Sequence, residues 1–134
     1  MFVRFFGSAL LGACILTAPL HGQRVHQVKL IHGTGDMFRF DPNRVDARPG
    51  EVLEFVVQSG GPYVIGFEAL DLTESGRALL DQAIPDHSAP LRGPVLPGPG
   101  SRFRIVLPSL PRGSYRFASI THLAYRMGGL LVIK

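Results

Sequence analysis

Three side chains that can bind a metal ion or hold a proton lie close together near the C-terminal end of the chain. They have the spacing Ser119-x2-His122-x4-Met127. The imidazole of His122 and the thioether of Met127 are both acceptable to a soft ion such as Cu(I), so this pair could hold copper loosely. The Ser119 hydroxyl stays protonated near neutral pH and is a weak, hard donor. A metal site built from this stretch alone would therefore lack a strong anionic ligand.

The one cysteine of the chain, Cys14, lies far from this stretch in an apolar segment. Residues 1–23 hold an early charge at Arg4, an apolar run over 5–20 and then a polar break. This three-part layout is typical of a secretory signal peptide with cleavage near Gly22, and the run is short for a bilayer span. We therefore expect a signal peptide at 1–23, a periplasmic or secreted protein, and no thiolate in the folded domain.

A different processing route is also open. The run Leu11-Gly12-Ala13-Cys14 resembles the lipobox at which bacterial lipoproteins are cut and acylated, and such a lipid would tether the domain to a membrane. Lipidation at Cys14 would leave an unusually short signal, and the apolar run continues past it. Removal of the whole segment is the favoured prediction, with no membrane contact unless Cys14 is lipidated.

The elements that position the C-terminal residues are expected to be β-strands. After residue 23 the apolar residues alternate with period two, and Gly and Pro interrupt the chain about every ten positions, which predicts an antiparallel sandwich. A type II turn is expected at Pro49-Gly50. Residues 24–134 are enough for a single domain with its own core. The expected strands lie near 28–30, 38–40, 53–57, 63–67, 103–107 and 115–119, and the last at either 130–132 or 131–133.

One short helix is expected inside a long connection. Thr73 can cap a helix over Glu74 to Ala83, with Leu79 and Leu80 on its inner side. The loop over 85–100 that follows is too rich in proline to be a central strand.

The charge of the chain is unevenly distributed, although the whole sequence carries a formal net charge of only +4. The segment from Glu68 to Asp86 holds five carboxylates, whereas the segment from His87 to Lys134 holds seven Lys or Arg and no carboxylate. Such an asymmetry can steer an oppositely charged protein partner, although basic residues that alternate along strands are also an ordinary solvent face. Nucleic-acid binding is not expected, because no aromatic side chains interleave with the arginines.

Several segments, taken in order, resemble a known family. These are Phe38-Arg-Phe-Asp-Pro42, Arg48-Pro-Gly50, the segments 59–67 and 119–129, and Gly113-Ser-Tyr115. They are similar to the landmarks of plastocyanin/azurin-type cupredoxins, which are small blue-copper proteins, and they span nearly all of the chain after residue 23. The resemblance implies a Greek-key antiparallel β-sandwich with one short helix in a long connecting loop.

The resemblance also implies where a copper ion would be bound. In the family two histidines, a cysteine and a methionine hold the metal, and the matching positions here are Tyr63, Ser119, His122 and Met127. A type 1 site needs two imidazoles and a thiolate with a weak axial thioether. Tyr63 could assist Cu(II) only after losing a phenol proton with a pKa of about 10. We therefore expect no type 1 copper, with His122 and Met127 as weak metal candidates.

Two functions remain open from the sequence. The favoured one is an exported cupredoxin-like domain without a cofactor that acts as a binding or structural module, with Tyr63 and Met127 filling the metal space. The alternative is a copper-binding protein that uses His122 and Met127 in copper handling or electron transfer. An enzyme is not expected, because the sequence holds no nucleophile elbow, phosphate loop or metalloprotease helix.

Overall fold

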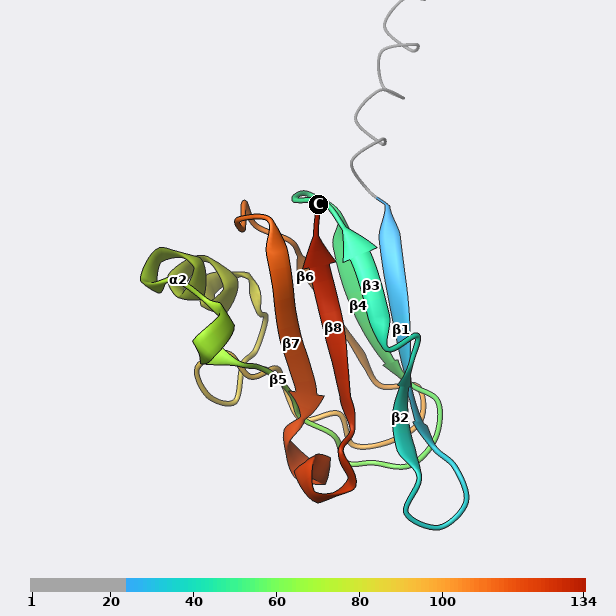
Figure 1. Cartoon of the computed structure of the whole chain (residues 1–134). Helices are drawn as coiled ribbons and strands as arrows, with labels where there is room; N and C mark the ends of the chain where they lie inside the picture. The colour runs from blue at the N-terminus through green and yellow to red at the C-terminus, as the bar shows by residue number, and fades with distance from the viewer. Residues whose placement is uncertain (1–23) are drawn as a thin grey trace, which may run out of the picture.

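The computed structural model describes residues 24–134, so the predicted signal peptide and Cys14 lie outside the described residues. The described chain forms two four-stranded sheets that face each other, with helix α2 at one side (Figure 1). Within the described chain no helix is long and apolar enough to cross a bilayer. The strands are β1 (Val25–His32), β2 (Phe38–Asp41), β3 (Arg44–Ala47), β4 (Val52–Val57), β5 (Ile65–Phe67), β6 (Arg102–Val106), β7 (Gly113–Ser119) and β8 (Gly128–Ile133).

The two sheets contain both parallel and antiparallel pairs. One has the order β2-β1-β4-β6 and the other β3-β8-β7-β5. The pairs β1–β4 and β3–β8 are parallel, and the remaining pairs are antiparallel. The predicted Greek-key sandwich with one short helix is confirmed, but its pairing is not antiparallel throughout. The chain passes from β2 in one sheet to β3 in the other and back to β4, which lets later strands lie beside earlier ones in the same direction.

The core lies between the sheets and is rich in aromatic side chains. Phe117 of β7 is 1% exposed, and its ring centroid lies 4.9 Å from that of Phe40 and 5.2 Å from that of Phe55. Leu131 and Ile133 of β8 point into this core at 0% and 2% exposure. Of the two registers that the sequence left open for the last strand, the structure therefore has 131–133 inward, because alternate residues of a strand face opposite sides.

The predicted helix is present as α2 (Glu74–Ala83), and the Thr73 hydroxyl caps it by accepting from the Gly76 N–H at 3.1 Å. Its inner side was partly mispredicted. Leu80 is fully buried, but Leu79 is 40% exposed. Adjacent helical residues point about 100° apart, so a helix this short on the surface buries only one of the two.

The proline-rich loop over 85–100 covers the edge of β5. Tyr63 and Leu96 exchange two backbone hydrogen bonds of 2.9 and 2.8 Å, the Gly93 N–H donates to the Ile65 carbonyl, and the Phe67 N–H donates to the Leu91 carbonyl. The strand predicted at 63–67 is therefore shorter, and Tyr63 lies in an isolated bridge beyond its end. The loop satisfies backbone groups that would otherwise be open to pairing with another chain.

The strand β3 was not predicted as a separate element. It is four residues long, and only Val45 and Ala47 of it face the core. So short an alternation, directly after Asp41-Pro42, gives little period-two signal.

Candidate functional site

The four residues predicted to line a metal pocket meet at one end of the sandwich. Ser119 ends β7, His122 lies in the 3₁₀ segment η3 (Ile120–Tyr125), and Met127 directly precedes β8. The Ser119 N–H donates to the Met127 carbonyl at 3.0 Å, which closes this loop onto itself. Tyr63 lies in the connection ahead of β5. The carbonyl of the next residue, Val64, accepts a hydrogen bond from the Ile120 N–H at 2.7 Å.

All four side chains are removed from solvent. Tyr63 and Ser119 are 0% exposed, Met127 is 1% exposed and His122 is 9% exposed. The pocket is therefore an interior site, in which each polar group needs a partner.

The partners of His122 determine which ring nitrogen carries its proton. His122 Nδ1 lies 3.0 Å from Ser119 Oγ and 2.9 Å from Thr121 Oγ1. The Thr121 hydroxyl donates to the Pro62 carbonyl at 3.1 Å, because that carbonyl can only accept. Its single proton is thereby used, so Thr121 Oγ1 can only accept from the imidazole. On this basis we assign the proton of the neutral ring to Nδ1, the nitrogen that faces Ser119.

Tyr63 occupies the side of the pocket opposite this network. Its ring centroid lies 4.9 Å from that of His122, and its hydroxyl donates to the Ser59 carbonyl at 2.7 Å. Burial raises the pKa of the Tyr63 phenol. His122 Nδ1 therefore has the Ser119 hydroxyl as a partner, whereas the Tyr63 hydroxyl is bonded to the backbone.

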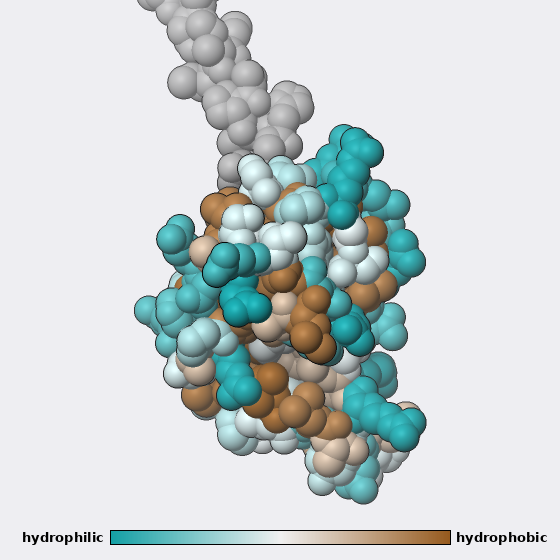
Figure 2. All heavy atoms as spheres, turned by 60° about the vertical axis from the view of Figure 1, so that its left-hand side comes forward, coloured by the Kyte–Doolittle hydropathy of each residue, from teal (hydrophilic) through white to brown (hydrophobic). Residues whose placement is uncertain are grey.

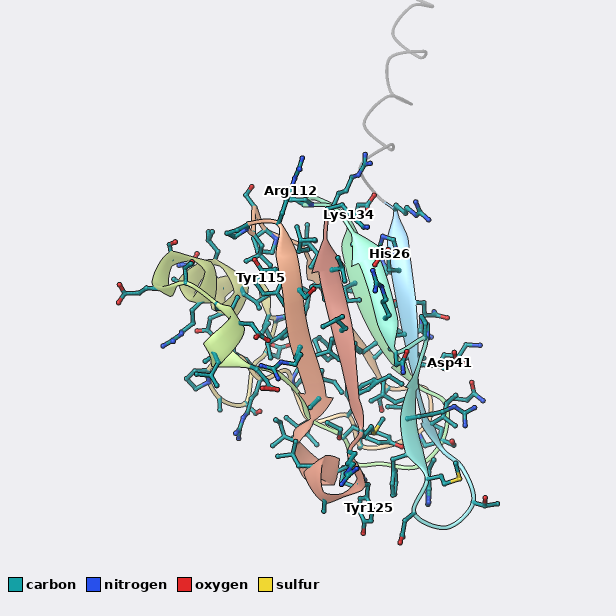
Figure 3. The ribbon with its side chains drawn as sticks, viewed as in Figure 1. His26, Asp41, Arg112, Tyr115, Tyr125 and Lys134 are labelled. Carbon is teal, nitrogen blue, oxygen red and sulfur yellow. The ribbon has the colours of Figure 1, made fainter. Side chains whose placement is uncertain are left out.

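An aromatic cluster that sequence reasoning missed surrounds His122. The ring centroid of Phe38 lies 4.2 Å from that of His122, and His32 stacks on Phe38 at 4.2 Å. Tyr125 lies 4.9 Å from Phe38 and marks this end of the molecule in Figure 3. His32 and Phe38 are paired residues of β1 and β2. A predicted hairpin between the runs at 28–30 and 38–40 would have been the signal that brings them together.

His26 and His87 lie away from His122. His26 bonds Glu51 at 2.8 Å, and Nδ1 of His87 lies 3.1 Å from the Ile84 carbonyl at the end of α2. Among residues 24–134, no three His, Cys, Asp or Glu side chains converge on a point that could hold a metal ion. The donors available in the pocket are one imidazole, one thioether, a phenol and two hydroxyls.

The pKa of His122 is lowered from its ordinary value of 6.5, first because burial disfavours the imidazolium and second because His32 adds positive charge nearby. In the unfolded chain the His122 imidazole becomes protonated at about pH 6.5, whereas in the folded chain it becomes protonated only at lower pH. The contribution of neutral His122 to the stability of the fold is therefore complete above about pH 6.5. It is lost as the pH falls toward the lowered pKa of the folded state.

We expect the free energy of unfolding to fall between about pH 7 and pH 5, and to fall less in His122→Gln. Urea unfolding at several pH values measures this, and the difference between the two proteins removes the contribution of the other histidines. Equal slopes in the two proteins would contradict the assignment. This pH range lies above the one in which Glu51 and Glu54 become protonated. The pKa values of these two carboxyls are lowered, first by hydrogen bonds from His26 and Gln27 respectively, so the protein loses their contribution to stability only at more acidic pH.

Comparisons with known proteins show the fold. No family model and no curated protein matches the chain. Solved cupredoxins do match. A mutant plastocyanin of fern has a TM-score of 0.63 and 23% identity, covering 81% of this chain and 100% of that chain. Pseudoazurin from Methylobacterium extorquens AM1 has a TM-score of 0.53 and 22% identity, covering 81% and 74%.

Auracyanin from Roseiflexus castenholzii has a TM-score of 0.53 and 16% identity, covering 84% of this chain and 98% of that chain. The chain therefore has the cupredoxin fold, as the order of its motifs predicted. At these identities the likeness concerns the fold alone. Any chemistry must be argued from the residues that this chain itself places in the pocket.

Proposed function

We propose that the protein is a metal-free cupredoxin-fold module that acts by binding a partner, without type 1 copper. The observation that carries this proposal is the hydrogen-bonded closure of the pocket. His122 Nδ1 bonds the Ser119 and Thr121 hydroxyls, and Tyr63 fills the facing space with its hydroxyl on the Ser59 carbonyl. The hydroxyls of Tyr63, Ser119 and Thr121 and Nδ1 of His122 all have partners within the protein, so no ion is required to satisfy them.

The donor set supports the same conclusion. The short copper–thiolate bond is what gives a type 1 site its electronic structure, and a serine hydroxyl is neither soft nor deprotonated at neutral pH. A metal that binds the imidazole through Nδ1 would have to displace the proton that this nitrogen carries. It would also have to take the Ser119 and Thr121 hydroxyls away from their present partners. Both changes oppose binding.

Copper handling is the second candidate. It is favoured by one observation, namely that His122 and Met127 both contact Ser119 from the same loop, one through its side chain and one through its backbone. An amicyanin with this fold is described as a reduced Cu(I) form. In this chain the imidazole and thioether would be the ligands, with neutral donors completing the shell.

Copper titration separates the two functions. We expect neither Cu(I) nor Cu(II) to bind in the pocket with a Kd at or below about 1 µM. Isothermal calorimetry on the wild type and on His122→Ala measures this, with His26→Ala as the control for an unrelated histidine. Visible spectra recorded on the same Cu(II) samples report any copper–thiolate bond.

Micromolar binding that disappears in His122→Ala and survives in His26→Ala would establish copper handling instead. An intense thiolate-to-copper band would contradict both functions at once, since residues 24–134 contain no cysteine. If copper binds and the heat of binding is the same in both variants as in the wild type, copper binds outside the pocket, which agrees with the proposal.

A further inference from the structure

Three cationic residues lie side by side at the end of the sandwich remote from His122. Arg48 directly follows β3, Lys134 directly follows β8, and Arg112 directly precedes β7. These strands are neighbours in the order β3-β8-β7. Figure 3 shows Arg112 and Lys134 at the same end of the molecule, with Tyr125 at the other. The arrangement of these three residues is independent of whether copper binds at His122.

The register of the strands fixes how close the three residues are. Ile133 pairs with Ala47 on one side and with Gly113 on the other, and the Lys134 N–H donates to the Ala47 carbonyl at 2.9 Å. Neighbouring strands are about 4.8 Å apart. Three consecutive strand ends therefore each carry one positive side chain, and Lys134 lies in the middle.

These side chains surround a hollow. Arg48, Arg112 and Lys134 line an open hollow of about 600 Å³ together with Ile133, whose side chain is only 2% exposed. The volume is within the range of small-molecule sites. No Asp or Glu side chain is among the lining residues.

The positive charge of this cavity is poorly compensated. Within residues 24–134, no carboxylate lies within 4 Å of the guanidinium of Arg48 or Arg112. Lys134 is 3.7 Å from Asp46, which is bonded more closely by Arg44 at 3.0 Å. An adjoining hollow shares Arg48 and Lys134 and adds Arg24, Asp46, Ala47 and Glu51. Its Glu51 is itself held by His26 at 2.8 Å.

The clustering of Arg48, Arg112 and Lys134 distinguishes them from the other basic residues. Arg104 and Arg102 of β6 lie 2.7 and 3.8 Å from the buried Glu54, and Arg116 of β7 lies 3.1 Å from Asp71. Arg39 and Arg77 have no carboxylate within 4 Å among the described residues, but neither lines this hollow. An anion bound between three neighbouring cations would be attracted by all of them.

We propose that this cavity binds a small ligand with two or more anionic oxygen groups, either phosphoryl or carboxylate. Two guanidinium groups can each form bidentate hydrogen bonds to such groups, and the ammonium supplies a third charge. This site goes beyond the metal-free pocket, because it gives the module a ligand class and a place to bind it.

Calorimetry on the protein as purified tests the site with inorganic phosphate, pyrophosphate and citrate, each at low and high NaCl. We expect at least one of these anions to bind, and each of Arg48→Gln and Arg112→Gln to weaken it about tenfold. The matched control is the double variant Arg39→Gln/Arg77→Gln, which lowers the net charge by the same amount as Arg48→Gln/Arg112→Gln. Arg39 and Arg77 are exposed residues of β2 and α2.

Binding of pyrophosphate but not citrate identifies phosphoryl ligands, and the reverse identifies carboxylates. Backbone amide shifts in the wild type give a second measurement that does not depend on the variants folding. The anion should shift Arg48, Arg112, Gly113 and Lys134 rather than Ser119 and His122. No binding of any anion, an equal loss in the control double variant, or shifts confined to the His122 end would each overturn the proposal.

Discussion

The double variant Tyr63→His/Ser119→Cys is expected to bind one Cu(II) ion and to become intensely coloured, whereas the wild type stays colourless. The change supplies the imidazole and the thiolate that a type 1 site needs beside His122 and Met127. These four positions already meet in one buried pocket, with His122 Nδ1 3.0 Å from Ser119 Oγ and 4.9 Å between the rings of His122 and Tyr63.

The gain can be followed by stability as well as colour. A ligand present at about a thousand times its Kd stabilises the folded state by about 4 kcal/mol. For a domain of this size that corresponds to a rise in Tm of roughly 15 °C. Differential scanning calorimetry with and without Cu(II) measures it, and the wild type should shift by less than about 2 °C because copper has no site in it.

Thr121 gives an internal check on this prediction. Its oxygen accepts from His122 Nδ1 and its proton is donated to the Pro62 carbonyl, so it still competes for the imidazole after Ser119 is replaced. Adding Thr121→Val to the double variant should tighten copper binding further. Tyr63→His alone should remain colourless. If the double and triple variants fold but neither becomes coloured, the four positions do not converge on one ion.

Phe117→Ala is expected to lower the free energy of unfolding by about 3–5 kcal/mol. The ring is 1% exposed and contacts Phe40, Phe55 and Phe67 at centroid distances of 4.9, 5.2 and 6.1 Å. Its removal leaves a cavity between the two sheets. Because small domains are stable by only about 5–15 kcal/mol, this single change consumes a large part of the total.

Ser119→Ala, two residues along the same strand, is the matched comparison. It removes one hydroxyl from the network, and His122 Nδ1 keeps Thr121 as a partner, so we expect a loss of about 1 kcal/mol. Urea unfolding of both variants gives the midpoints and slopes. A loss from Ser119→Ala as large as that from Phe117→Ala would mean that the polar network, rather than the aromatic core, holds the sheets together.

The elements of the fold were largely predictable because local signals and tertiary structure agree. Thr73 and the helix Glu74–Ala83 appear with the predicted bounds. The turn at Pro49-Gly50 has φ of 91° at Gly50, and the Glu51 N–H donates to the Arg48 carbonyl at 3.1 Å, as a type II turn requires. Strand pairing was less accessible, since no local pattern shows that β1 lies parallel to β4 or β3 parallel to β8.

The same distinction applies to the pocket. The meeting of its four members was predictable, because the order of the motifs along the chain resembles that of a family whose arrangement is known. The contact between Thr121 and the Pro62 carbonyl joins residues 59 positions apart, and it is this contact that fixes the proton on His122. The stack of His32 on Phe38 likewise depends on a cross-strand register. The first contact has no signal in residue types or spacing, and the second would have required a predicted hairpin between the runs at 28–30 and 38–40.

The burial of the Glu54 carboxylate could not be predicted from the sequence pattern either. Glu54 occupies an outward position of β4 yet is only 2% exposed, because Arg104 and Gln27 bond it from the strands on either side, at 2.7 and 2.9 Å. Alternation assigns such a position to solvent. The opposite exception also occurs, since apolar side chains lie on the surface. Figure 2 shows them among hydrophilic ones over the face on the α2 side.

The interior position of β8 has a consequence for the order in which the sandwich folds. This strand is the last one of the described chain, and it lies between β3 and β7 in its sheet. Until β8 is in place, β3 has no sheet neighbour and one edge of β7 is unpaired, so the second sheet cannot form without it. Its docking must bring together Arg44–Ala47 and Leu130–Ile133 across most of the described chain, which is slow for contacts of such sequence separation. We therefore expect the sheet that contains β8 to be completed late in folding.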